Sequence, residues 1–135
     1  MKALLDTNIL IDYLNGIDAA RQEIGRYLTP TISVITWMEV MAGAKDDDEA
    51  VLRRFLQRFR CIAIDQPIAE RTVQLRRTLH LKLPDAIIAA SAQVNDVLLV
   101  TRNTKDFSSD EPWVRMPIRS DVAQMTSDGV DPTAS

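Results

Sequence analysis

The chain has a single cysteine, Cys61, and a single histidine, His80. One cysteine cannot form an intrachain disulfide, so nothing in the sequence implies an oxidising compartment. A Ser-His-Asp or Cys-His scheme would have to use His80, whose place at a predicted helix end favours a surface role. No apolar stretch approaches the ~18 residues of a membrane span, and Asp6 and Asn8 interrupt the apolar run at the N-terminus. We therefore expect a soluble, cytoplasmic protein.

Length and composition favour one globular domain. The 135 residues are 46% hydrophobic and 26% charged, a balance that excludes a disordered or fibrous chain. A chain of this length can bury a proper core without disulfides or metals as staples. Residues 120–135 contain three aspartates and no lysine or arginine. The sequence therefore predicts a domain over residues 1–119 and an acidic C-terminal tail over residues 120–135, which we expect to be flexible.

The distribution of charge along the chain is more informative than the net charge. The net charge of −3 argues weakly against a nucleic-acid partner. Between residues 53 and 82, however, the sequence contains eight basic residues and only two acidic ones. Such a segment is either a solvated helix face or a surface that contacts phosphates or an acidic partner, and composition does not separate these interpretations.

Short apolar runs alternate with segments of helical periodicity. The runs predict strands over residues 2–5, 32–35, 61–64 and 97–100, with a short fifth over 114–116. The periodic segments predict helices over residues 7–15, 19–27, 36–44, 49–59, 67–79 and 85–94. This alternation is typical of an α/β protein, with three α/β/α layers around a mostly parallel central sheet. In such a fold Cys61 is expected to be a small buried side chain.

Four acidic residues lie near the strand ends where such sheets bind ligands. Asp6 directly follows the first strand, and Glu39 lies about one helical turn after the second. Asp106 follows the fourth strand by a short loop, and Asp85 opens a helix. Carboxylates that converge on one rim raise one another's pKa, so they need a cation. Carboxylate oxygens without His or Cys ligands suit Mg²⁺ or Mn²⁺.

Each acidic residue also has a purely structural interpretation. Asp6 could cap the helix that follows it, and Glu39 completes a Thr36-x-x-Glu39 capping box. Asp85 would be stabilised by the dipole of its helix, and Asp106 could be an ordinary loop residue. The four together are more informative than any one of them.

Four stretches carry a resemblance to a known family: Leu4–Ile11 (LLDTNILI), Ser33–Glu39 (SVITWME), Leu83–Ala90 (LPDAIIAA) and Leu99–Phe107 (LVTRNTKDF). In this order they resemble the acidic motifs of PIN-domain ribonucleases, and most closely the VapC-type toxins of bacterial toxin–antitoxin pairs. The resemblance covers nearly all of the chain before the acidic tail. It implies an endoribonuclease dependent on Mg²⁺ or Mn²⁺, with three partners: an RNA substrate, a cognate antitoxin, and a second copy of the chain in a homodimer.

The resemblance also assigns roles to residues. The residues that match its catalytic acidic quartet are Asp6, Glu39, Asp85 and Asp106. We expect Asp6 and Asp85 to be the principal metal ligands. Thr101 and Asn103 match polar residues of the fourth motif, where they would fix carboxylates or water by hydrogen bonds. Arg102 and Lys105 stand close enough in sequence to hold phosphates.

Three other functions compete with this interpretation. A phosphatase of the haloacid-dehalogenase type could use Asp6 as nucleophile, but it needs a second aspartate where this chain has Asn8. A receiver domain needs an acidic pair at the first strand, and none precedes Asp65. A catalytically silent PIN-like binding scaffold is the third alternative, and the presence of all four acidic residues argues against it.

Overall fold

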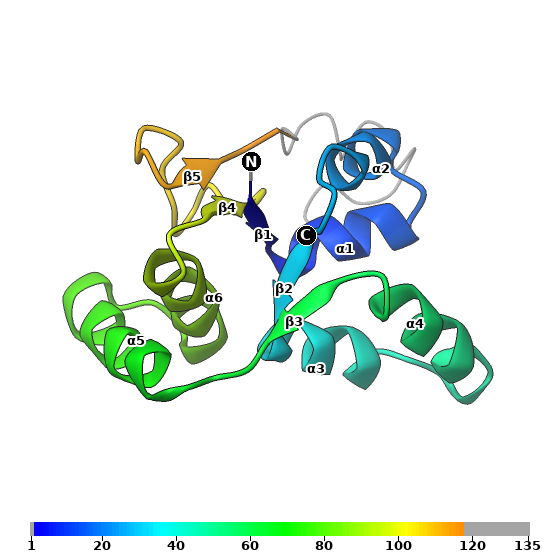
Figure 1. Cartoon of the computed structure of the whole chain (residues 1–135), viewed down its shortest axis with the longest axis horizontal. Coiled ribbons are helices and arrows are strands. Elements are labelled where there is room, and N and C mark those ends of the chain that lie inside the picture. Colours follow the sequence, from blue (N-terminus) through cyan, green and yellow to red (C-terminus); the bar gives the residue numbers. More distant parts are fainter. Residues whose placement is uncertain (1, 118–135) are drawn as a thin grey trace.

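The computed structural model describes residues 2–117 and shows alternating strands and helices (Figure 1). The predicted acidic tail lies outside these residues. The elements in chain order are β1 (Ala3–Leu5), α1 (Thr7–Leu14), α2 (Asp18–Gly25), β2 (Thr31–Ser33), α3 (Val34–Ala42), the 3₁₀ turn η1 (Asp46–Asp48), α4 (Glu49–Leu56), β3 (Arg60–Ile62), α5 (Gln66–Leu79), α6 (Leu83–Val94), β4 (Leu98–Val100) and β5 (Val114–Arg115).

All five strands are parallel, in the order β3-β2-β1-β4-β5. The chain builds the sheet outward from β1 in one direction as far as β3, then crosses over to β4 and builds in the other direction. The switch point therefore lies between β1 and β4, where Leu5 is in register with Val100. In open parallel sheets, ligands bind beyond the carboxyl ends of the strands at this point. The predicted α/β class is confirmed.

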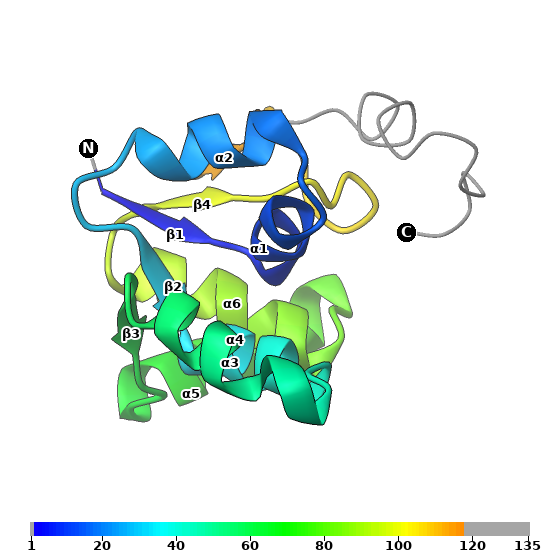
Figure 2. The ribbon, with the colours of Figure 1, turned by 90° about the vertical axis from the view of Figure 1, so that its right-hand side faces the viewer.

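Two apolar clusters cover the two faces of the sheet. Along β1, Ala3 and Leu5 pack into the cluster formed with α1, α2 and α4, whereas Leu4 packs with α5 and α6. This alternation follows from the two-residue period of a strand. Figure 1 shows the two sets of helices on opposite sides of the sheet, and Figure 2 shows β1 and β4 side by side between α2 and α6. The layers are therefore α/β/α, as predicted.

The start of α3 differs from the prediction. The strand was expected to run to residue 35, with a capping box from Thr36 to Glu39. Instead, Ser33 is the N-cap of α3, and its hydroxyl accepts a hydrogen bond from the Ile35 N–H at 3.2 Å. A serine cap satisfies an otherwise unpaired helix donor, so the helix begins directly at the end of β2. Thr36 and Glu39 are thereby free for contacts with other elements.

Cys61 was predicted to be buried, and this is wrong. It lies on β3, which is an edge strand of the sheet, and its side chain is exposed. An edge strand is covered less completely than a central one, and an isolated apolar run does not reveal which strand is the edge. The acidic run Asp46–Asp48 at η1 is exposed. Within residues 2–117, no helix is long and apolar enough to cross a membrane.

Candidate functional site

The site begins at Asp6, the first residue after β1. Its N–H donates to the Val100 carbonyl at 2.8 Å, so the backbone continues the pairing of β1 with β4. The side chain is only 4% exposed. Its Oδ1 accepts from the Thr7 N–H and caps α1, which confirms the capping interpretation. Its Oδ2 accepts from the Thr101 hydroxyl at 2.7 Å, so the same carboxylate also joins two strand ends.

Thr101 organises the polar groups at the end of β4. Its side chain is fully buried, and besides donating to Asp6 its hydroxyl accepts from two groups. These are the Asn103 N–H at 3.0 Å and the Asn8 side-chain amide at 3.3 Å. A buried hydroxyl with all three partners fixes its neighbours tightly. The hydrogen bonds expected from Thr101 are therefore present, and one of them goes directly to a carboxylate of the quartet.

Glu39 reaches the same edge of the sheet from α3. The Thr7 hydroxyl donates to Glu39 Oε1 at 2.6 Å. That hydroxyl also lies 2.9 Å from the hydroxyl of Thr36, which is fully buried. The start of α1 and the middle of α3 are thus linked through two threonine hydroxyls, and this linkage holds the otherwise exposed Glu39 carboxylate near Asp6.

Asp85 and Asp106 approach from the other side. Asp85 lies in the first turn of α6, and Asp106 belongs to the loop after β4. Burial raises the pKa of Asp85, and the negative charges of Asp106 and Glu39 and a hydrogen-bond contact with Asp106 raise it further, while Lys82 opposes the shift. The two carboxyls are therefore close neighbours.

The four carboxylates form one electrostatic cluster. Burial raises the pKa of Asp6 from 3.8 to about 6, and the charges of Asp85 and Glu39 add to the effect against the opposing hydrogen bond from Thr101. The convergence predicted from sequence is thus present in the fold, with carboxylates from four separate elements acting on one another. Such a concentration of like charge favours binding of a cation.

The donor set fits a hydrated Mg²⁺ or Mn²⁺. Within residues 2–117, no three His, Cys, Asp and Glu side chains are placed to hold a metal ion by themselves. Mg²⁺ does not require such a cage, because it commonly binds through one or two carboxylates and completes its shell with water and substrate phosphates. Two carboxylate oxygens from the acidic cluster are therefore sufficient to hold the ion. The bound cation would also reduce the repulsion between the carboxylates.

Asn103 shapes the loop that carries Asp106. Its side-chain carbonyl accepts from the N–H groups of Lys105 and Asp106, each at 3.1 Å. Its amide nitrogen donates to Asp106 Oδ2 at 3.0 Å. Asn103 therefore closes a tight turn and aims one carboxylate at the same time, which matches the orienting role expected of it.

Arg102 does not have the environment expected of a phosphate ligand. Its Nε and Nη2 donate to the two carboxylate oxygens of Asp12 at 2.8 and 3.2 Å. Both side chains are mostly buried. The expectation that Arg102 holds phosphates is therefore not supported by its contacts, because its guanidinium fork is already engaged by a carboxylate of α1.

Four residues of this region lay outside the expected set: Thr7, Asn8, Asp12 and Thr36. A usable signal existed for two of them, since Asn8 and Asp12 are four residues apart and share one face of α1. Both contact Arg102, because Asn8 Oδ1 also accepts from the Arg102 N–H at 3.2 Å. The two threonines could not be found in this way, since their contact spans two helices.

The basic segment between residues 53 and 82 is not one surface. The fold places Arg53 and Arg54 on α4 and Arg71, Arg76 and Arg77 on α5. These two helices lie on opposite sides of the sheet (Figure 1). Several of its side chains already have polar partners: Arg53 donates to Glu49, Arg58 to Tyr13 and Arg71 to Gln93. The summed charge of the segment therefore overstates the positive potential at any single place.

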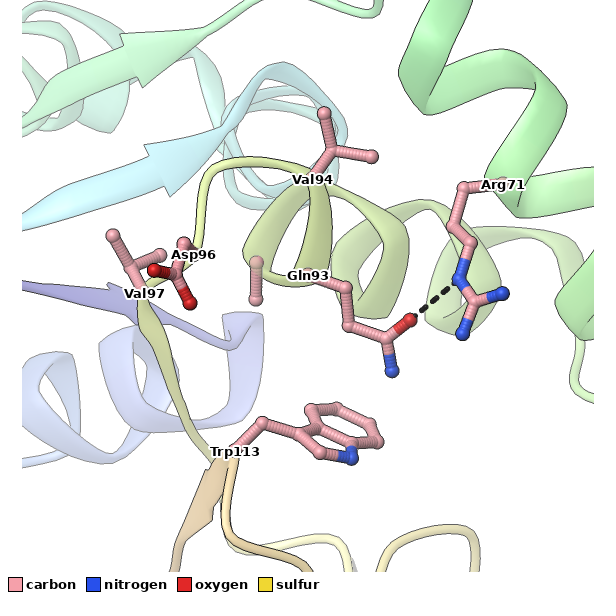
Figure 3. A pocket seen from close by; sticks show the side chains of 7 residues that line it. Arg71, Gln93, Val94, Asp96, Val97 and Trp113 are labelled. Carbon is pink, nitrogen blue, oxygen red and sulfur yellow. Dashed lines mark hydrogen bonds between the residues drawn. The ribbon is translucent and has the colours of Figure 1, made fainter.

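A pocket of about 470 Å³ lies beside the end of α6 (Figure 3). It is lined by Arg71, Ala92, Gln93, Val94, Asp96, Val97 and Trp113. These residues come mainly from the end of α6 and from the chain leading into β4 and β5, at the amino ends of those strands. The carboxylates lie at the carboxyl ends. This pocket and the acidic cluster therefore lie at opposite edges of the sheet.

The fold and the acidic cluster together define a parallel α/β protein that gathers four carboxylates at its topological switch point. Residues 3–109 match the family described as "PIN domain". The chain belongs to the PIN-domain family, and the membership inferred from its four motifs is confirmed.

Individual relatives agree with this assignment. The chain is 32% identical over 112 residues to Ribonuclease VapC10 of Mycobacterium tuberculosis, across 77% of this chain and 84% of that protein. It is similar to a solved toxin–antitoxin complex from Klebsiella pneumoniae, with 50% identity, a TM-score of 0.81 and coverage of 87% of this chain and 99% of that one. It is also similar to a DNA-bound VapBC structure from Salmonella typhimurium, with 28% identity, a TM-score of 0.72 and coverage of 85% and 96%.

Proposed function

We propose that this protein is an endoribonuclease dependent on Mg²⁺ or Mn²⁺, acting in the cytoplasm as the toxin of a toxin–antitoxin pair. The observation that carries the proposal is the gathering of Asp6, Glu39, Asp85 and Asp106 at one edge of the sheet in a PIN-domain chain. A relative of 32% identity is named a ribonuclease, which supports RNA as the substrate.

Each residue of the site has a proposed role. Asp6 and Asp85 hold the metal ion, which when bound supplies an acidified water and charge neutralisation at the phosphate. Glu39 and Asp106 complete the shell through water or accept a proton during hydrolysis. Thr101 donates to Asp6, and Asn103 donates to Asp106, so that each fixes one carboxylate. The Thr101 hydrogen bond favours the ionised form of Asp6 that a cation requires.

The proposed partners are a cognate antitoxin and a second copy of the chain. Two similar solved structures, of 50% and 28% identity, are described as a toxin–antitoxin complex and as VapBC. We further propose that residues 1–119 form the nuclease domain and residues 120–135 a separate acidic tail. Size-exclusion chromatography of the chain with and without its co-encoded neighbour tests the partners. A chain that binds no such neighbour and stays monomeric would contradict both.

The activity is tested by incubating purified protein with total RNA and Mg²⁺ or Mn²⁺. We expect discrete fragments that disappear with EDTA and with Asp85→Asn. Asp96→Asn is the matched control, because it makes the same chemical change at the opposite edge of the sheet, at a positive φ that asparagine tolerates. Fragments from Asp85→Asn would refute the assigned metal ligand.

Two alternative functions predict different results. A silent binding scaffold would show neither cleavage nor metal binding. A haloacid-dehalogenase-type phosphatase would hydrolyse a small chromogenic ester, but its nucleophile would be Asp6, a buried carboxylate whose oxygens already accept from Thr7 and Thr101. Family membership and this environment both favour the nuclease.

A further inference from the structure

An ion pair lies directly behind the acidic cluster, between α1 and the loop that follows β4. Arg102 Nε and Nη2 donate to the two oxygens of Asp12 at 2.8 and 3.2 Å. The exposed fractions of the two side chains are 17% and 6%. A planar guanidinium that grips both oxygens of one carboxylate fixes direction as well as distance. This pair therefore constrains where the backbone at Arg102 can lie.

The same stretch of loop is held to α1 at two further points. The Arg102 N–H donates to Asn8 Oδ1 at 3.2 Å, and the Thr101 hydroxyl donates to Asp6 Oδ2 at 2.7 Å. The N-cap of α1 and two of its helical residues thus contact two consecutive residues of the loop. Because these contacts involve the first two residues of the loop, they fix the start of the loop relative to the carboxylate of Asp6.

The same loop carries Asp106, and Asn103 fixes the position of this carboxylate. The Asn103 N–H donates to the Thr101 hydroxyl at 3.0 Å, and the Asn103 side chain bonds both the N–H and the carboxylate of Asp106. The negative charge of Asp106 in turn raises the pKa of Asp85, so the turn at Asn103 carries a carboxylate of the acidic cluster. A displacement of Arg102 would therefore move the turn at Asn103 and, with it, the Asp106 carboxylate.

We propose that Asp12 and Arg102 are positioning residues that hold Asp106 against Asp85, and that Arg102 does not bind the RNA phosphate. The inference rests on the nuclease function proposed above. Phosphate binding by Arg102 would require its guanidinium to leave Asp12, and the carboxylate left behind would be buried without a partner. The occupied fork and the burial of Asp12 both oppose that exchange.

We call the Asp12–Arg102 ion pair the clamp. Four variants test its role: Asp12→Asn, Arg102→Gln, Arg102→Lys and the double variant Asp12→Asn/Arg102→Gln. The readouts are the divalent-ion concentration for half-maximal cleavage, kcat, and RNA affinity measured by fluorescence anisotropy without divalent ions. We expect each single variant to lower kcat or raise the required ion concentration by about 10-fold or more, since supporting residues of metal sites have effects of that size. RNA affinity should stay within about twofold, because no phosphate contact is lost.

Two comparisons separate positioning from phosphate binding. Arg102→Lys keeps the positive charge but loses the fork, so it should be impaired if Arg102 positions the loop and nearly normal if it only attracts phosphate. The double variant should be no worse than the more impaired single variant, because both substitutions break one shared interaction. Arg102→Lys also keeps the charge pair, so it serves if a neutral variant fails to fold.

The ion pair between Glu23 and Arg115 is a matched structural control. Arg115 Nε and Nη2 donate to the two Glu23 oxygens at 2.8 and 3.0 Å, a two-point geometry close to that of Arg102 and Asp12. This pair joins β5 to α2, whereas the clamp joins α1 to the loop that carries Asp106. Glu23→Gln should lower the melting temperature as Asp12→Asn does. It should leave the required ion concentration and kcat unchanged.

Several results would overturn the proposal. Weaker RNA binding by Arg102→Gln, with Asp12→Asn unaffected, would make Arg102 a phosphate ligand. If Asp12→Asn and Glu23→Gln lower the melting temperature equally and change neither kcat nor the required ion concentration, the clamp is purely structural. A wild-type chain that cleaves no RNA would refute the proposed function instead, and Mn²⁺ titration would then test the clamp. Weaker Mn²⁺ binding by Asp12→Asn and Arg102→Gln, but not by Glu23→Gln, would support it, and any other order would refute it.

Discussion

The Thr101 hydroxyl and the Asp6 carboxylate are 95 residues apart in sequence and form a buried hydrogen bond of 2.7 Å. The bond joins the carboxyl ends of β1 and β4, the two strands at the switch point of the sheet. Burial raises the pKa of Asp6 to about 6, and the Thr101 hydrogen bond opposes that rise. The fold therefore keeps a carboxylate inside the protein and supplies the donor that makes its ionised form accessible near neutral pH.

Replacement of Thr101 by valine keeps the shape of the side chain and removes this donor. We expect the acidic limb of the pH–activity profile to move to higher pH, because the pKa of Asp6 rises when its hydrogen bond is lost. We also expect a loss of stability of about 1–3 kcal/mol, since the Asn103 N–H loses its buried acceptor. Thr72→Val is the control, because that buried hydroxyl donates only to the Ile68 carbonyl of its own helix. An unshifted profile for Thr101→Val would show that Thr101 does not set the protonation of Asp6.

The raised pKa of Asp6 also predicts how stability depends on pH without metal. The folded state binds this proton more tightly than the unfolded state, with pKa values of about 6 and 3.8. The contribution of Asp6 is therefore fully present below pH 4 and is lost as the pH rises through 6, by about 3 kcal/mol. Urea unfolding in EDTA at several pH values, with Asp6→Asn as reference, measures the difference. A wild-type chain that gains stability over this range relative to Asp6→Asn would contradict it.

Glu39 should affect catalysis and stability in opposite directions. Glu39→Gln keeps an oxygen that can accept from Thr7 but removes a negative charge that raises the pKa of both Asp6 and Asp85. We expect cleavage to fall by about 100-fold while the melting temperature in EDTA rises or stays the same. The matched control is Glu49→Gln on α4, which breaks the exposed pair with Arg53 and should leave cleavage unchanged. A lower melting temperature for Glu39→Gln would mean that Glu39 stabilises the fold.

The position of Cys61 on an edge strand predicts its reactivity. The thiol is exposed, so it should react completely with Ellman's reagent in the native protein. Partial burial by its neighbours raises the pKa of the thiol, so the reaction at neutral pH should be slower than that of free cysteine. A thiol that reacts only after denaturation would show that this edge of the sheet is covered, as by a second copy of the chain.

Local patterns were sufficient for most of the fold. Hydrophobic periodicity located the strands and helices to within a few residues, because each element must turn apolar side chains toward the sheet. Strands that alternate with helices implied parallel pairing, and parallel pairing placed Asp6 and Asp106 at one edge. The exception at α3 has a local cause, since the Ser33 hydroxyl provides a cap that lets the helix start two residues earlier than predicted.

The errors concern contacts between distant segments. An arginine directly before an asparagine turn has the same local sequence whether its guanidinium is free or paired with a buried carboxylate. Nothing near Arg102 in the sequence therefore revealed its pairing with Asp12. The exposure of Cys61 depended in the same way on the order of strands in the sheet. The basic segment looked continuous along the chain, but α4 and α5 lie on opposite faces.

The sequence by itself determined the α/β class, the family and the four carboxylates, because periodicity and motif spacing are properties of the chain. Only the tertiary structure decided which groups support those carboxylates. Thr101 meets Asp6, Thr7 meets Glu39, and Arg102 meets Asp12 across 95, 32 and 90 residues. Burial then raises the pKa of Asp6 and of Asp85, since desolvation depends on everything packed around a group and not on its neighbours in sequence.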